Sequence, residues 1–204
     1  MAYDASTFAA YAAHAPAYAD DWLSQPPPTD LQATIERWFL KGADGGITAD
    51  IGCGSGREVD WLERHGYPAI GFDGSDALLA EARTRFPDLR FEHAELPELD
   101  LIASRTFDNV LCETVLMHLP RDAIAASVKS LRRILRPRGT LYVSWRVSEV
   151  DHRDERGRLY SAFDASLVLD ALDGMDIVHS VEATSASSGK RIHAVVARDL
   201  RDER

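Results

Sequence analysis

The sequence predicts an α/β fold with a seven-stranded, mostly parallel sheet, helices on both faces and an antiparallel hairpin at its C-terminal end. Three observations lead to this prediction. Short apolar runs alternate with helical patterns from Ile47 onward. A glycine-rich turn joins the first apolar run to the first helical pattern that follows it. The last two apolar runs are separated by a loop too short for a crossover helix.

Five apolar runs are the expected parallel strands: Ile47–Ile51, Pro68–Phe72, Leu89–Phe91, Phe107–Glu113 and Thr140–Trp145. The expected helices around them lie at about Asp30–Lys41, Arg57–His65, Ser75–Phe86 and Arg121–Leu135, with Ser75 as a capping residue. Pro137–Gly139 is expected to end the last of these helices. Alternation of this kind produces right-handed crossovers and a parallel sheet.

The alternation stops near the C-terminus. A predicted helix at Ala165–Leu172 is followed by two strand-like runs, Ile177–Glu182 and Arg191–Ala197. The segment between them, Ala183–Lys190 (ATSASSGK), is rich in serine and has only eight residues. Two strands joined by so short a loop pair antiparallel.

Two further segments lie outside the strand pattern. The first 25 residues carry several aromatic side chains, among them Phe8, Tyr11, Tyr18 and Trp22. Arg146–Tyr160 is charged and mostly non-periodic. Ligands of open α/β sheets bind at the carboxyl ends of the strands, and we expect the N-terminal segment to fold over that edge. We therefore predict one domain over residues 1–204, with a helical lid at residues 1–30 and a core at residues 31–204.

Composition narrows the class of protein. The 204 residues carry a formal net charge of −10, which disfavours a nucleic-acid partner because such binding relies on Lys and Arg. No apolar run approaches the roughly 20 residues of a membrane span, and Met1–Ala19 lacks the basic start of a signal peptide. We expect a cytoplasmic monomer or homodimer without a membrane partner. Cys53 and Cys112 have neither disulfide nor metal spacing, so we expect no metal.

The segment with the clearest chemistry is Ala49–Glu58 (ADIGCGSGRE), where the first strand turns into a helix. Gly52, Gly54 and Gly56 allow a tight turn that brings backbone N–H groups close to a ligand. Asp73 ends the second strand about 20 residues later, where an acid can accept hydrogen bonds from ribose hydroxyls. This combination predicts a nucleotide or nucleoside site.

The spacing of the glycines indicates whether the ligand is a dinucleotide such as NAD or a nucleoside without phosphates. A dinucleotide fingerprint from Gly52 requires a third glycine at the position of Arg57, whose side chain would crowd the contact between helix and strand. The third glycine lies one residue earlier, at Gly56. This spacing favours a nucleoside ligand without phosphates over NAD.

With these residues in place, the chain resembles the class I S-adenosylmethionine (SAM)-dependent methyltransferases, a Rossmann-like family, over nearly its whole length. Ala49–Gly56 is similar to their first motif, with Asp50 as its acid and Asp73 as the ribose-binding acid. His93–Pro97 (HAELP) resembles the adenine-binding stretch, although His93 stands where the family often has Asp. Phe107–Pro120 and Leu131–Val143 are similar to the fourth- and fifth-strand motifs.

A narrower likeness is to the small TehB-type and thiopurine-type methyltransferases. It rests on Gly56–Arg57, on Val115–Met117 and on the ending Gly189–Arg198. Tyr11 and Tyr18 resemble the tyrosines of a lid that closes over SAM in many enzymes acting on small molecules. The resemblance therefore implies methyl transfer from SAM to a nucleophilic atom of a small molecule.

The resemblance implies SAM contacts at Tyr11, Asp50, Gly52, Cys53, Gly54, Ser55, Gly56, Arg57, Asp73, Gly74, Ser75, Ala94, Glu95, Leu96, Glu113 and Thr114. We expect Asp50 to act indirectly by accepting N–H groups of the loop. Arg57 either pairs with the SAM carboxylate or is an ordinary surface arginine. Glu113 ends the fourth strand and is expected to face the methionine end of SAM.

The acceptor is expected to lie near Tyr18, His118, Trp145 and Arg146. His118 follows the fourth strand by a few residues, where it is either a general base or a hydrogen-bonded loop histidine. Trp145 is either a pocket wall or a packing residue, and Arg146 either binds an anionic substrate or is solvated. The arginines of the following loop, including Arg153, Arg156 and Arg158, are expected to be plain surface.

Three other functions remain open from the sequence. The first is a SAM-binding protein with other or no catalysis. The second is an NAD-dependent oxidoreductase, which Arg57 disfavours. The third is a methyltransferase acting on protein or RNA, which the acidic charge disfavours.

Overall fold

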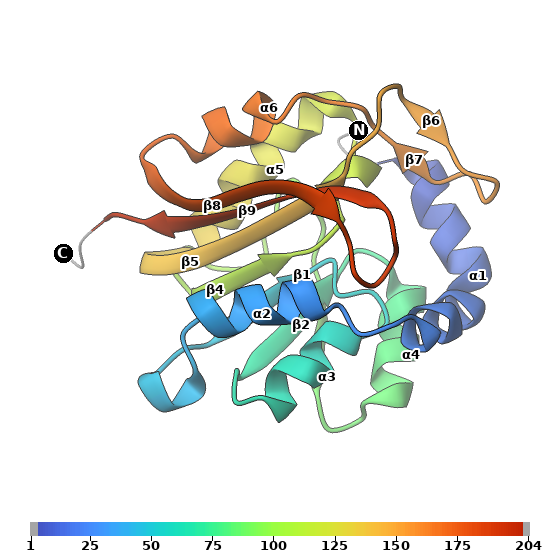
Figure 1. Cartoon of the computed structure of the whole chain (residues 1–204). Helices are drawn as coiled ribbons and strands as arrows, with labels where there is room; N and C mark the ends of the chain where they lie inside the picture. The colour runs from blue at the N-terminus through green and yellow to red at the C-terminus, as the bar shows by residue number, and fades with distance from the viewer. Residues whose placement is uncertain (1–3, 202–204) are drawn as a thin grey trace.

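The computed structural model describes residues 4–201, which form a seven-stranded sheet with helices on both faces (Figure 1). The strands are β1 (Thr48–Ile51), β2 (Ala69–Asp73), β3 (Arg90–His93), β4 (Phe107–Cys112), β5 (Leu135–Arg146), β8 (Met175–Thr184) and β9 (Arg191–Asp199). Their order is β3-β2-β1-β4-β5-β9-β8. Strands β1–β5 run parallel, whereas β9 is antiparallel to both β5 and β8. The predicted fold class is confirmed.

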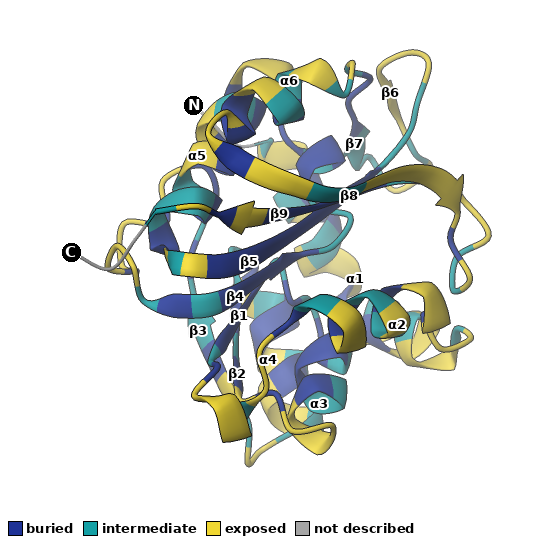
Figure 2. Cartoon of the chain, turned by 60° about the vertical axis from the view of Figure 1, so that its left-hand side comes forward, coloured by how far each residue is buried: buried dark blue, intermediate teal, exposed yellow. Residues whose placement is uncertain are grey.

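Two apolar layers hold helices against the sheet. On one face lie α2 (Thr29–Trp38), α3 (Arg57–Arg64) and α4 (Asp76–Arg85), and on the other α5 (Arg121–Ile134) and α6 (Ser166–Leu169). Short 3₁₀ helices lie at Gly42–Asp44, Leu116–His118 and Asp170–Leu172. Figure 2 shows the inner strands buried and the outer sides of the helices exposed. The Ser75 hydroxyl accepts a hydrogen bond from the Leu78 N–H, which confirms the predicted cap.

Some boundaries differ from those predicted. Strand β5 begins at Leu135 rather than after Pro137–Gly139, because Leu135 already pairs with Phe107. The next paired residue is Thr140, opposite Asn109, so the proline segment bulges out of the ladder where its missing N–H is tolerated. Helix α6 is only four residues long and continues as a 3₁₀ turn.

Helix α1 (Ala5–Ser24) lies at the carboxyl edge of the parallel strands, beside α4 (Figure 1). The Asp4 side chain caps it by accepting from the Thr7 N–H at 2.8 Å. The helix is kinked at His14, two residues before Pro16, whose ring and missing N–H interrupt a regular helix. Residues 1–3 of the predicted lid lie outside the described residues. Among residues 4–201, no helix is both long and apolar enough to cross a bilayer.

A small hairpin, β6 (His152–Arg153) and β7 (Leu159–Tyr160), lies beside α1 (Figure 1). The Thr7 hydroxyl accepts from the Leu159 N–H at 2.9 Å, and Arg153 forms two hydrogen bonds with the Asp4 carboxylate. This hairpin was not predicted, because strands of two residues leave no periodic pattern in the sequence. The charged Arg146–Tyr160 stretch is therefore a folded partner of α1.

Asn109 in β4 ties the sheet to the chain that follows α2. Its buried side chain accepts from the Leu40 N–H at 2.9 Å and donates to the Leu40 carbonyl at 2.8 Å and to the Thr48 hydroxyl at 3.1 Å. We expect Asn109→Ala to lower the free energy of unfolding by about 1–3 kcal/mol, measured by denaturant unfolding. The exposed Thr84→Ala is the control and should change it by about 0.5 kcal/mol or less. Equal stability of the two variants would contradict this role.

Candidate functional site

A cavity lies where β1, β2 and β4 end, under the aromatic side of α1. Its empty volume is about 930 Å³, including space open to solvent, which is within the range of small-ligand sites. The lining residues predicted from the sequence are Tyr11, Tyr18, Asp50, Gly52, Cys53, Gly54, Asp73, Gly74, Ser75, Ala94, Glu95, Leu96, Glu113, Thr114 and His118. Most of the predicted site is therefore brought together in one place.

The three glycines of the turn have different tasks. A Cβ on Gly52 would lie 2.3 Å from Val115, and one on Gly56 would lie 2.7 Å from the Phe91 ring, so these two glycines permit close packing. A Cβ on Gly54 would meet only the Tyr18 ring, at 3.8 Å across the cavity. Gly54 is thus the glycine that leaves room for a ligand, and its φ of 54° also favours glycine.

The Asp73 carboxylate holds the turn in shape. One oxygen accepts from the Gly54 N–H at 2.9 Å, and the other accepts from the Ser75 N–H at 2.8 Å. Burial raises the pKa of Asp73, while these two donors and His93 lower it. We expected Asp50 to accept N–H groups of the loop. That expectation is wrong, because Asp73 has this role and no hydrogen bond to the Asp50 side chain is found among residues 4–201.

Five carboxyl groups line this cavity: Asp50, Glu58, Asp73, Glu95 and Glu113. Burial, together with the charges of Glu58 and Glu113, raises the pKa of Asp50 well above its usual value, and one Asp50 oxygen is buried without a hydrogen-bond partner. Burial and the charge of Glu58 raise the pKa of Glu113 to about 8. The cavity is therefore rich in carboxyl groups that burial and mutual repulsion make harder to ionise, and a cationic ligand is favoured because it offsets that repulsion.

The turn after β3 supplies the opposite wall. Ala94, Glu95 and Leu96 line the cavity, while His93 is turned away. The His93 ring contacts Asp76 at 2.9 Å and Glu95 at 3.3 Å. Backbone and apolar contacts from this segment therefore remain available to a flat base, as expected.

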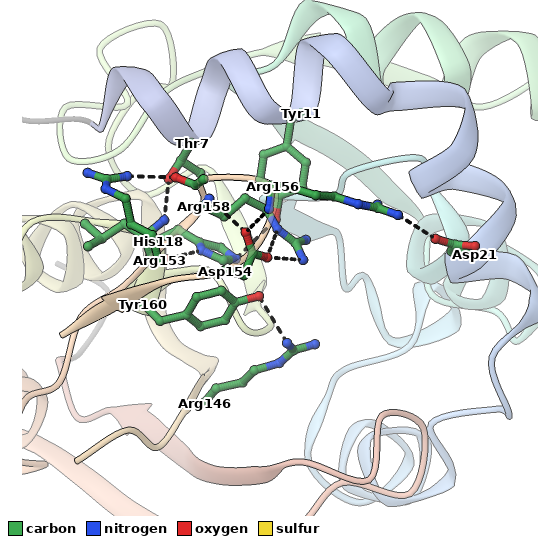
Figure 3. A network of polar contacts seen from close by, with 12 residues as sticks. Thr7, Tyr11, Asp21, His118, Arg146, Arg153, Asp154, Arg156, Arg158 and Tyr160 are labelled. Carbon is green, nitrogen blue, oxygen red and sulfur yellow. Dashed lines mark hydrogen bonds and ion pairs between the residues drawn. The ribbon is translucent and has the colours of Figure 1, made fainter. Parts of the chain in front are cut away.

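His118 lies between α1 and the hairpin (Figure 3). Its Nδ1 is 2.6 Å from the Leu159 carbonyl, so Nδ1 carries the proton and donates to that oxygen. Its Nε2, 3.1 Å from the Tyr11 hydroxyl, is then the acceptor. Burial is the main cause that lowers the pKa of His118 to about 4. The charges of Arg158 and Arg146 also lower it, whereas the hydrogen bond to the Leu159 carbonyl raises it. The imidazole is neutral at pH 7, with its free electron pair directed at Tyr11.

A second cavity adjoins the first and shares Tyr11, Tyr18, Trp22, Thr114 and His118 with it. Its other lining residues are Asp21, Gln25, Met117, Arg146, Arg156, Arg158 and Tyr160. Its empty volume is about 650 Å³, including space open to solvent. Two neighbouring compartments under one helix can hold two reactants side by side.

Three predicted cofactor residues do not line the first cavity. Ser55 is fully buried beneath the loop, and Gly56 begins α3 against the Phe91 ring. The Arg57 guanidinium lies 4.3 Å from the Trp22 ring and is held there by an ion pair with Glu58. Arg57 is therefore withdrawn from the cavity, and its predicted pairing with a ligand carboxylate does not fit this position.

Trp145 is not a pocket wall. It is buried in the core, stacked on His193 with ring centres 4.7 Å apart, and it lines neither of the two cavities. Successive side chains of a strand point to opposite faces. Because Arg146 faces the second cavity, the preceding residue of β5 must turn into the core.

Several lining residues were not predicted as site residues. They are Thr7, Phe8, Trp22, Ile51, Glu58, Leu78, Val115 and Leu119 in the first cavity, and Met117, Arg156, Arg158 and Tyr160 among those in the second. Phe8, Tyr11, Tyr18 and Trp22 follow helical spacing, which is a signal for one aromatic helix side. The arginines gave no periodic signal, because their position depends on the hairpin.

Among residues 4–201, no group of three or more His, Cys, Asp or Glu side chains is arranged to hold a metal ion.

Comparison with known proteins agrees with this geometry. Residues 49–143 match the family described as a methyltransferase domain. This match covers just under half of the chain, and solved structures of SAM-dependent methyltransferases share its fold. It is 35% identical over 98 residues to trans-aconitate 2-methyltransferase of Rhizobium meliloti, a match covering 47% of this chain and 33% of the relative. The chain spans 33–54% of the length of four curated relatives that it matches.

Two solved methyltransferase structures share the fold. One is the 1,6-didemethyltoxoflavin-N1-methyltransferase of Burkholderia thailandensis, with a TM-score of 0.69, 20% identity, and coverage of 97% of this chain and 88% of that one. The other is a TehB-like SAM-dependent methyltransferase of Corynebacterium glutamicum, with a TM-score of 0.66, 19% identity, and coverage of 92% and 98%. The fold of the methyltransferase domain is thus shared over nearly the whole chain.

The cavity fits SAM, the cofactor of SAM-dependent methyltransferases. SAM carries a positive sulfonium and a positive ammonium group, and the cavity offers five carboxyl groups, one with an oxygen that has no partner. The open space at Gly54 and the acid at Asp73 lie where a nucleoside would be held. A dinucleotide with its negative pyrophosphate would be repelled by the same carboxyl groups.

Gly54→Ala tests the loop. We expect it to weaken binding of S-adenosylhomocysteine by roughly tenfold or more, about 1.4 kcal/mol, because its Cβ enters the ligand space. Gly66→Ala is the matched control, since Gly66 has a φ of 83°, open space around its Cβ and a position remote from the cavity. Both substitutions carry the strain of about 1–2 kcal/mol of a left-handed residue, so stability should fall alike while only Gly54→Ala loses binding. Equal affinities by calorimetry would remove Gly54 from the site.

Proposed function

We propose that this protein transfers a methyl group from SAM to a nucleophilic atom of a small molecule. The observation that carries the proposal is the pairing of two cavities, one lined by carboxyl groups and built on a glycine turn, the other beside it under the same helix. When bound, SAM would supply an electrophilic methyl group, and the acceptor's nucleophilic atom would bond to that carbon in line as the carbon–sulfur bond breaks and S-adenosylhomocysteine leaves. The protein orients the two reactants and excludes water.

In this proposal the first cavity holds SAM. Asp73 and the turn around Gly54 hold the ribose, and Ala94–Leu96 contact the base. Asp50, Glu58 and Glu113 favour the positive charges of the ligand, because a cation lowers the electrostatic cost of ionising these carboxyl groups. This assignment does not need Arg57.

We propose that α1 is a lid over both cavities. Tyr11 and Tyr18 pack edge to face with ring centres 5.0 Å apart, and Tyr18 stacks on Trp22 at 5.9 Å. The helix is joined to the hairpin by hydrogen bonds of Asp4 and Thr7 and by an ion pair between Asp21 and Arg156. The Tyr11 hydroxyl joins it to His118 (Figure 3). Such a cover admits a small acceptor more readily than a folded protein or RNA.

The acceptor's proton has a path out of the second cavity. An O–H or N–H acceptor beside Tyr11 can pass its proton to the tyrosine oxygen while the Tyr11 proton moves to Nε2 of His118. Because the pKa of His118 is only about 4, this path assists the displacement rather than fully ionising the acceptor beforehand. An acceptor that is already ionised needs no such path.

Relatives support a small-molecule acceptor. Their names include trans-aconitate 2-methyltransferase and ubiquinone biosynthesis O-methyltransferase, both acting on small molecules. A SAM-binding protein with other or no catalysis, or a methyltransferase acting on protein or RNA, is the alternative.

Methyl transfer into fractions of a cell extract separates these functions. With SAM labelled in its methyl group, we expect label to enter the fraction of small molecules and to be absent from protein and RNA. Gly54→Ala should reduce the transfer and Gly66→Ala should not. Label in protein or RNA would favour the second alternative. SAM binding without transfer into any fraction would contradict the proposed activity.

His118→Ala tests the proton path. For an O–H or N–H acceptor we expect kcat to fall by about 10²-fold or more, with the affinity for S-adenosylhomocysteine nearly unchanged. The wild-type rate should decline only as the pH falls toward 4, because protonated imidazole can no longer accept a proton. His65→Ala, on the far end of α3, is the control. Full activity of His118→Ala with an unchanged pH profile would leave His118 as a structural residue.

A further inference from the structure

The second cavity differs from the first in its charge. Three arginine side chains, Arg146, Arg156 and Arg158, line it, against the single carboxylate of Asp21. The rings of three tyrosines and one histidine also line this second cavity: Tyr11, Tyr18, Tyr160 and His118. Acids line the cavity assigned to SAM, so the two compartments select opposite charges.

Two of the arginines already have acidic partners. Arg158 forms an ion pair with Asp154 at 2.7 Å, and Arg156 forms a longer one with Asp21 at 3.5 Å. Both pairs lie where the hairpin meets α1 (Figure 3). Their charges are largely balanced by these partners.

Arg146 is the exception. It forms no ion pair with an acid anywhere in residues 4–201, and its one hydrogen bond is from Nη1 to the Tyr160 hydroxyl at 3.2 Å. Its Nε is buried without any hydrogen-bond partner. A guanidinium has five N–H donors, and a buried donor without an acceptor is costly. The side chain therefore has unused capacity for an anionic oxygen group.

The location of Arg146 places that capacity beside the expected reaction site. Arg146 is the last residue of β5. Two residues earlier in the same strand, Ser144 accepts hydrogen bonds from the Thr114 N–H, at 3.0 Å with its carbonyl and at 3.1 Å with its hydroxyl, so the segment that follows β4 is held against β5. Thr114 and His118 line both cavities. An anion held by Arg146 would lie next to the boundary between the two compartments.

We propose that Arg146 binds an anionic oxygen group, a carboxylate or a phosphate, of the methyl acceptor. This assignment rests on the proposed methyltransferase function and specifies its substrate class: a small acid whose body packs against the tyrosine rings of the second cavity. Arg158, paired with Asp154, stands over the Tyr11 and Tyr18 rings at 5.4 and 5.8 Å, so Arg146 is the arginine of this compartment that has no acidic partner of its own among the described residues.

SAM has a carboxylate of its own, which is a second source of the same chemistry. Calorimetry with two nucleosides distinguishes the sources. S-adenosylhomocysteine has the amino-acid carboxylate, and 5′-methylthioadenosine lacks it. We expect Arg146→Gln to bind both with the affinity of the wild type. Weaker binding of S-adenosylhomocysteine alone would assign Arg146 to the cofactor and overturn the proposal.

The second part of the experiment measures how tightly small acids and their uncharged analogues bind in the presence of saturating S-adenosylhomocysteine. Benzoate, salicylate and succinate are compared with their uncharged amides, and phenyl phosphate is compared with phenol. We expect at least one acid to bind the wild type about 10- to 100-fold more tightly than its neutral partner, the range for a hydrogen bond to a charged group. Preference for carboxylates or for phenyl phosphate identifies which anion the acceptor carries.

The preference should disappear in Arg146→Gln and be retained in Arg191→Gln. Arg191 is an exposed residue of β9 that pairs with Glu182 and serves as the control. Arg146→Lys should keep part of the preference, because it retains the charge but loses the two-pronged geometry. Absence of any preference in the wild type, or its persistence in Arg146→Gln, would overturn the proposal. A wild type that binds neither nucleoside would instead contradict the proposed function itself.

Discussion

The shape of the whole site depends on the carboxylate of Asp73. Its two oxygens accept from the N–H groups of Gly54 and Ser75, so one side chain at the end of β2 fixes both the glycine turn after β1 and the start of α4. The first cavity lies between these two turns. A neutral residue at this position would leave two N–H groups without their acceptor, and the cavity would lose its rim as well as a ligand contact.

A second constraint comes from the cover of the site. Helix α1 and the β6–β7 hairpin stabilise one another through the Asp4, Thr7 and Tyr11 contacts, and His118 lies between them. The Leu159 carbonyl of the hairpin determines which nitrogen of His118 carries the proton. The cover thus closes the cavities and also sets the chemical state of the histidine beneath it.

The mostly parallel sheet with its antiparallel C-terminal pair, and the glycine turn at its edge, could be predicted from sequence, because strand-and-turn periodicity and the Ala49–Glu58 segment are local signals. Three features could not. Trp145 and Arg146 were both expected at the site, but strand alternation allows only one of them. The separate tasks of the three glycines depend on distant partners such as Val115 and Tyr18. Arg158 acquires its position from a hairpin held by tertiary contacts rather than by its own sequence.

The central claim is that the first cavity accepts a cationic nucleoside because carboxyl groups line it. Calorimetric titration with SAM and with NAD at pH 7, in two buffers of different ionisation enthalpy, tests it most directly. Glu113, with a pKa of about 8, is mostly protonated in the free protein at this pH. A bound cation lowers that pKa, so SAM should bind with release of protons, and its affinity should rise with pH up to about 8. NAD should not bind. Binding of NAD in preference to SAM, or binding of SAM without proton release, would contradict the account.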